Sequence, residues 1–147
     1  MINEILQSEQ YKKLVQKQIY ETIEYLLDNS IEFSITANIG LVDFNPKLPQ
    51  HISSKLQKFS LFSILRSNYA LISFELHEEF ITFETGFGNE NFGSVVKIPL
   101  HCIFQIVIDE SILYINSVAT VEKFNENPKE KSMNVFKNNP NNKKFDK

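Results

Sequence analysis

The spacing of apolar residues changes near residue 30, and this change constrains the fold more than any other feature of the sequence. Between residues 9 and 28 apolar side chains recur every three or four positions, which predicts one amphipathic helix with Ser8 as its N-cap. The recurring residues are Leu14, Val15, Ile19, Ile23, Leu26 and Leu27. Tyr11, Tyr20 and Tyr25 widen this surface, so the helix either packs on its own domain or also meets a second copy of the chain.

From residue 31 to residue 118 the period of the apolar residues is two, which is typical of strands. Short alternating runs follow one another with tight connections, as in a small antiparallel barrel or sandwich. We therefore expect an α+β fold that is mainly β: the helix 9–28 followed by a small Sm/SH3-like β body over 31–118. Residues 1–118 would form one domain.

The alternation stops after residue 118, and the composition changes. Residues 122–147 contain seven Asn and seven Lys, with few large apolar side chains. Such a segment buries too little apolar surface to offset the entropy lost on ordering its backbone. We therefore expect residues 119–147 to form a flexible tail.

Cysteine content and hydropathy restrict the class of protein. The single cysteine, Cys102, excludes an intramolecular disulfide framework and a zinc site built on several cysteines. No apolar run approaches the roughly 20 residues that span a membrane, and the N-terminus lacks the pattern of a signal peptide. We expect a cytoplasmic protein with no membrane partner.

The charge is unevenly distributed. Residues 1–121 carry 8 basic and 14 acidic side chains, a net charge of −6, whereas residues 122–147 carry 7 Lys and 4 acidic residues, a net of +3. Nucleic-acid binding needs clustered basic side chains, so binding of RNA or DNA by the acidic body is disfavoured.

The residues that carry catalytic chemistry form no recognisable constellation. His51, His77 and His101 are widely separated, and His101 beside Cys102 would point to the opposite face of a strand. No phosphate-binding loop, nucleophile elbow or metal-ligand pair is present. We expect no enzymatic activity, no cofactor and no metal site.

One segment has the features of a groove for an extended peptide. Phe83, Thr85 and Phe87 lie on one face of a predicted strand, and Gly86 and Gly88 lack side chains that would keep another backbone away. A glycine bulge over ordinary core phenylalanines is the alternative interpretation.

The same segment resembles SspB, the stringent starvation protein B family of bacterial proteolysis adaptors. The family pattern F-x-x-x-F-G-G followed by V-x-[VI]-P-[LF] is similar to Phe83–Asn89 and Val96–Leu100. Tyr25–Asn29 resembles the W-L-L-D-N end of the family's first helix, and Leu61–Ile64 its V-L-N-I strand. The order of these motifs agrees over roughly residues 11–110, although Asn89 replaces the second glycine and the 89–93 loop is longer.

This resemblance implies a function. SspB proteins bind ssrA-tagged polypeptides, which ribosome rescue produces, and deliver them to the ClpXP protease. They are homodimers paired largely through the first helix, here the helix 9–28. On this reading we expect a peptide-binding groove lined or shaped by Leu61, Ser63, Phe83, Thr85, Phe87 and Gly88.

The tail resembles the alphaproteobacterial type of the family, whose C-terminus S-L-D-x-F-R-K-K docks on the ClpX unfoldase. The corresponding island spans residues 132–139, and its docking residues would be Met133, Val135, Phe136 and Lys137. Because residues 140–147 follow it, Lys143-Lys144-Phe145 is a second candidate. The competing function is an Sm-like β-barrel scaffold or RNA-associated binding module.

Overall fold

The computed structural model describes residues 1–126, and it begins with two helices, α1 (Ile2–Leu6) and α2 (Glu9–Asp28). Ser8 caps α2, because its Oγ accepts a hydrogen bond of 3.3 Å from the Tyr11 N–H. The buried face of α2 consists of Val15, Ile19, Ile23 and Leu26. The predicted helix 9–28 and its cap are therefore confirmed.

Within residues 1–126 the strands form two antiparallel four-stranded sheets. The first has the order β3-β1-β7-β8, with β1 (Phe33–Asn38), β3 (Phe59–Ile64), β7 (Ile103–Ile108) and β8 (Ser111–Ile115). The second has the order β2-β6-β5-β4, with β2 (Asp43–Asn45), β4 (Glu75–Leu76), β5 (Phe80–Phe87) and β6 (Phe92–Pro99). The predicted α+β class, mainly β, is confirmed.

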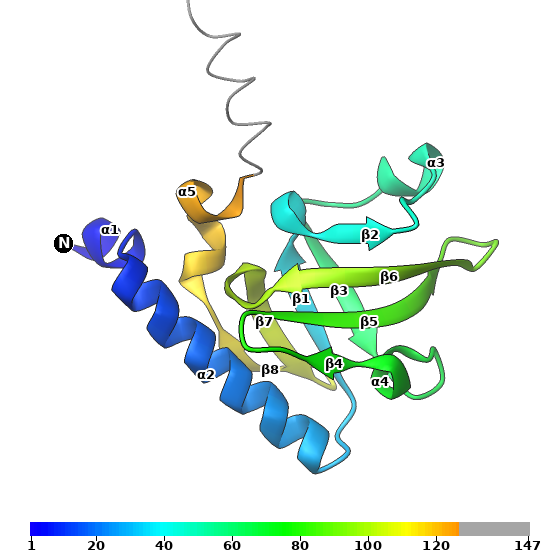
Figure 1. Cartoon of the computed structure of the whole chain (residues 1–147), viewed down its shortest axis with the longest axis horizontal. Coiled ribbons are helices and arrows are strands. Elements are labelled where there is room, and N and C mark those ends of the chain that lie inside the picture. Colours follow the sequence, from blue (N-terminus) through cyan, green and yellow to red (C-terminus); the bar gives the residue numbers. More distant parts are fainter. Residues whose placement is uncertain (127–147) are drawn as a thin grey trace, which may run out of the picture.

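Short helical turns lie between the strands and after the last strand, β8. They are η1 (Ile39–Leu41), α3 (Gln50–Ser53), α4 (Ala70–Ser73), η2 (Leu100–Cys102), η3 (Ser117–Thr120) and α5 (Glu122–Asn125). In Figure 1, α3, α4 and the β5–β6 turn lie at the end of the molecule opposite α1 and α5.

One apolar core joins α2 to both sheets. Its fully buried side chains include Ile19 and Ile23 of α2, Ile35 of β1, and Ile81 and Ile98 of β5 and β6. Figure 1 shows α2 running along the side of the molecule where β4 and β8 lie. Tyr114 of β8 donates a hydrogen bond of 2.7 Å to Gln18 Oε1 on α2, which fixes the helix against this side.

The segment before β5 differs from the sequence prediction. The alternation from Tyr69 to Leu76 suggests one strand, but Ala70–Ser73 forms α4 and the strand β4 is only two residues long. The short β4 leaves β5 without a strand neighbour on that side beyond Thr82, the last β5 residue that pairs with β4. This free edge positions the candidate site described below.

The predicted boundary between domain and tail at residue 118 is too early. Residues 117–125 form η3 and α5, and Phe124 and Asn125 are buried against the body. Asn125 Nδ2 donates to the carbonyl oxygens of Val118 and Val121 at 3.0 and 2.7 Å. These contacts satisfy backbone acceptors, which sequence periodicity cannot reveal.

Candidate functional site

Phenylalanine rings fill the space between β3, β5, β2 and α4. Phe62 of β3 contacts Phe83 and Phe87 of β5, with ring centroids 5.9 and 6.5 Å apart. Phe74 stacks on Phe83 at 6.0 Å, and Phe44 meets Phe87 edge to face at 5.7 Å. Phe83 is 1% exposed, so it belongs to the core and the expectation that it lines an open groove is wrong. Phe87 is half-buried at the margin of this cluster.

Leu61 and Ser63 do not face β5. Burial alternates along β3, so that Phe62 is 4% exposed whereas Leu61 is 63% exposed on the outer face of its sheet. Ser63 shares that outer face, where its Oγ lies 3.4 Å from Ser34 Oγ of β1. The structure therefore separates these two residues from Thr85 and Phe87, and Phe62 takes the place expected for them.

An open trough lies beside the end of β5 that β4 does not cover. It has a volume of about 460 Å³ and joins the 67–69 loop to the adjacent ends of β5 and β6. Thr85 is the only one of the predicted groove residues that lines this trough. The full lining is Ser67, Asn68, Tyr69, Glu84, Thr85, Gly86, Asn91 and Gly93.

The loop that forms one wall of the trough is held by Asn68. Its Oδ1 accepts hydrogen bonds from the backbone N–H groups of Leu65 and Ala70 at 3.3 and 3.0 Å. Its Nδ2 donates to the carbonyl oxygen of Ser63 at 2.8 Å. Tyr69 follows in the left-handed region with φ of 70°, and its side chain is exposed. A residue other than glycine in this conformation is uncommon and is retained where the surroundings impose it.

The free edge of β5 carries backbone groups that a guest strand needs. Successive residues of a strand direct their N–H and C=O groups alternately to the two sides. Phe80 C=O accepts from His77 N–H on the β4 side, and Glu84 N–H donates to Ser73 Oγ at 2.8 Å on that side. Gly86 is the next residue of this series, so its N–H and C=O face the edge beside the trough.

The three glycines of the hairpin that β5 and β6 form have different environments. A Cβ on Gly86 would lie 1.7 Å from Asn91 Oδ1, so Gly86 makes room for the Asn91 side chain. Gly88 has φ of +73°, and a Cβ there would lie 3.1 Å from Ile52 Cδ1. Gly93 has no atom within 4 Å of the position of a Cβ. Gly88 therefore shapes the turn and does not line the trough, and the register of β5 and β6 runs without a bulge from Phe80 to Phe87.

His51 of α3 braces the tip of the hairpin. His51 Nε2 lies 2.6 Å from Glu90 Oε1. The backbone N–H at Glu90 and the His51 ring both hydrogen-bond this carboxylate, which holds the pKa of Glu90 below its ordinary value. The turn between β5 and β6 is thereby tied to α3. The predicted loop over 89–93 is shorter in the structure, because Phe92 and Gly93 already belong to β6.

His101 and Cys102 lie in η2 and not in a strand, so the expected separation of their side chains is wrong. Cys102 Sγ is 3.7 Å from His101 Nε2, and both side chains are buried. Burial raises the pKa of the Cys102 thiol to about 12, which disfavours the nucleophilic thiolate. His101 Nε2 lies 2.6 Å from the Phe124 carbonyl oxygen, so this pair anchors α5.

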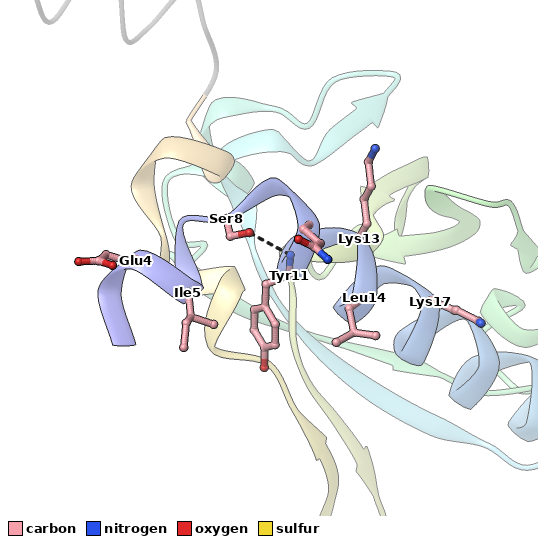
Figure 2. A pocket seen from close by; sticks show the side chains of 8 residues that line it. Glu4, Ile5, Ser8, Tyr11, Lys13, Leu14 and Lys17 are labelled. Carbon is pink, nitrogen blue, oxygen red and sulfur yellow. Dashed lines mark hydrogen bonds between the residues drawn. The ribbon is translucent and has the colours of Figure 1, made fainter. Parts of the chain in front are cut away.

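A second hollow lies between α1 and α2, where Tyr11 also packs against the core and Leu14 is exposed. Figure 2 shows the side chains of Ile5, Tyr11 and Leu14 on one side of these helices, with Ser8 capping α2 above them. The hollow has a volume of about 660 Å³. Leu14 and, near the other end of α2, Tyr25 are exposed. This is the apolar surface of the predicted helix that its own domain leaves uncovered.

Among residues 1–126, no group of three or more His, Cys, Asp or Glu side chains is placed to hold a metal ion. None of the helices in this part of the chain is long and apolar enough to cross a membrane. The predicted docking residues Met133, Val135, Phe136 and Lys137 lie outside the described residues.

Sequence reasoning missed most of the trough. Asn68, Tyr69 and Asn91 carry no periodic signal, because their roles depend on contacts between separate loops. The pair Gly86 and Gly93 was detectable only in part: both are glycines, but their pairing across β5 and β6 comes from the hairpin register. No protein-family model matches the chain, and no curated protein matches it.

Proposed function

We propose that this protein is a proteolysis adaptor of the SspB type, which binds ssrA-tagged polypeptides and delivers them to ClpXP. The proposal is supported by the ordered motifs that resemble this family and by the trough beside Thr85, within the segment that carries the resemblance. The trough is the observation that carries the proposal, because it joins an open hollow to a free strand edge.

In this proposal the tag binds as an extended strand. The free N–H and C=O of Gly86 hydrogen-bond the guest backbone, and the trough around Thr85 accommodates alternate side chains. Ser73 Oγ already hydrogen-bonds the backbone N–H of Glu84, so the guest is confined to the outer part of β5. Binding needs no chemistry from the adaptor, in keeping with the buried and protonated Cys102.

Delivery would use the tail. Residues 132–139 would dock on ClpX while the trough holds the tag, so the tag meets the unfoldase as part of one assembly. Such linkage raises the effective concentration of the second partner to as much as about millimolar. The last described helix, α5, lies at the end of the molecule opposite α4 and the β5–β6 turn, which border the trough (Figure 1).

A homodimer in the cytoplasm completes the proposal. The exposed Leu14 and the hollow beside Ile5 and Tyr11 offer an apolar surface for a second copy, centred on the predicted helix 9–28. Exposed apolar clusters of this kind mark contact sites between proteins. Two tails in a dimer would add avidity for a multisubunit unfoldase.

The test is a titration of the purified full chain into a fluorescein-labelled ssrA-tag peptide, followed by fluorescence anisotropy. Saturable binding is expected, together with the absence of binding to a peptide of the same composition in scrambled order. Equal responses to both peptides would overturn the proposed function. Salt-sensitive binding of RNA in a parallel filter assay, without peptide binding, would support the RNA-associated alternative.

A further inference from the structure

Glu84 is the charged side chain in the lining of the trough. The other lining residues are neutral, and they are serine, threonine, tyrosine, asparagine and glycine. The Glu84 side chain is exposed, and no ion pair of the described residues includes its carboxylate. The trough thus offers a negative charge that no ion pair among residues 1–126 neutralises.

Two cations on neighbouring segments, Lys97 and Arg66, are directed elsewhere. Lys97 lies on the same sheet face, paired with Thr82, but its Nζ is 4.3 Å from the centre of the Phe80 ring. Arg66 stands at the start of the loop that walls the trough, but its guanidinium donates to the carbonyl oxygen of Ser30. Each cation therefore has a partner away from Glu84.

The register of the free edge determines which guest residue would meet this carboxylate. Paired residues of neighbouring strands share a face, so a guest residue opposite Gly86 has its side chain on the face that carries Glu84. Glu84 then lies on the diagonal from this guest side chain, within reach of a long one. The next guest residues point to the Thr85 face, which leads toward Phe87 and the aromatic cluster.

We propose that Glu84 determines specificity in the trough and selects extended peptides with Lys or Arg at the position opposite Gly86. This inference rests on the proposed function, because it assumes that a peptide pairs with the edge of β5. Asn91 Oδ1, beside Gly86, supplies a second acceptor for the same cationic group. A neutral or acidic residue at that guest position loses the attraction or meets repulsion.

The test uses fluorescein-labelled ssrA-tag peptides in which each residue in turn is replaced by Lys or by Glu. With the native protein we expect one position at which the Lys peptide binds about three- to tenfold more tightly than the Glu peptide. E84Q should abolish this preference, and E84K should reverse it at the same position. The backbone of Glu84 keeps its bond to Ser73 in both variants, so folding is retained.

E122K is the matched control, because it makes the same charge reversal on α5, away from the trough. It should leave the preference of the native protein unchanged. If the peptides bind but the Lys and Glu peptides have equal affinity at every position, the inference on Glu84 is overturned and the proposed function stands. The same holds if E122K reverses the preference as E84K does. If none of the peptides binds, the proposed function fails and the inference fails with it.

Discussion

The rings of Phe62 and Phe83 meet edge to face with their centroids 5.9 Å apart, and this contact joins the two sheets. Phe62 comes from the edge strand β3 and Phe83 from β5, which belongs to the other sheet. The contact decides which part of β5 is core and which part is free for a partner. Phe83, which makes the contact, is buried. Thr85 and Gly86, which follow it along β5, lie beside the open trough.

Phe83→Ala should therefore act on stability. Removing a fully buried phenylalanine ring is expected to lower the free energy of unfolding by about 3–5 kcal/mol. Phe87→Ala should cost less, because the Phe87 ring is half-buried. Urea denaturation followed by circular dichroism measures both. If Phe83→Ala had native stability but no longer bound the tag peptide, Phe83 would contact the peptide and would not be a core residue.

Gly88 and Gly93, two of the three glycines of the β5–β6 hairpin, allow the same substitution to be compared in two environments. Gly88→Ala is expected to lower the free energy of unfolding by about 1–2 kcal/mol, because it forces a side chain into a left-handed conformation beside Ile52. Gly93→Ala should change it by less than about 0.5 kcal/mol, since its Cβ would enter open space. Equal losses for the two variants would contradict the assignment of separate roles.

Thr85→Gln tests the trough directly. A longer polar side chain at this half-buried position should fill the hollow and remove binding of the tag peptide in the anisotropy titration. Thr120→Gln in η3, at the α5 end of the molecule, is the control and should bind normally. Thermal melts of both proteins check that they are folded. Normal binding by a folded Thr85→Gln protein would show that the peptide site lies elsewhere.

His101 should make stability fall in acid. Burial lowers the pKa of His101 in the folded protein below its ordinary value of 6.5. Its Nε2 donates to the Phe124 carbonyl and its buried Nδ1 has no partner among the described residues, so a proton added there would lack an acceptor. Below about pH 6.5 the unfolded chain binds this proton more readily, and the free energy of unfolding decreases until the folded pKa is passed.

The measurement compares urea denaturation at about pH 8 and about pH 5.5. His101→Gln should lose less stability between these two conditions than the native protein loses. His77→Gln, in the turn between β4 and β5, should behave like the native protein. If the free energy of unfolding of His101→Gln changed with pH as much as that of the native protein, groups other than His101 would be responsible for the change.

Deleting residues 132–147 should separate binding from delivery. The truncated protein is expected to bind the tag peptide with native affinity and to lose acceleration of the degradation of an ssrA-tagged substrate by ClpXP. Deleting only residues 140–147 distinguishes the two docking candidates, because it retains Met133 and Phe136 but removes Lys143-Lys144-Phe145. Unchanged degradation with the longer deletion would refute the docking role of the tail.

The sequence by itself determined the helix 9–28, the change to strand period, the α+β class and the alternation of faces within β3 and β5. These features follow from the positions of apolar residues within one segment, which periodicity reports. The sequence did not determine that Phe62, and not Leu61, contacts Phe83. Nor did it determine that Ala70–Ser73 forms a helix, which leaves the edge of β5 free. Only the tertiary structure decided these points and the composition of the trough, because they depend on which distant segments pack together and satisfy one another's backbone groups.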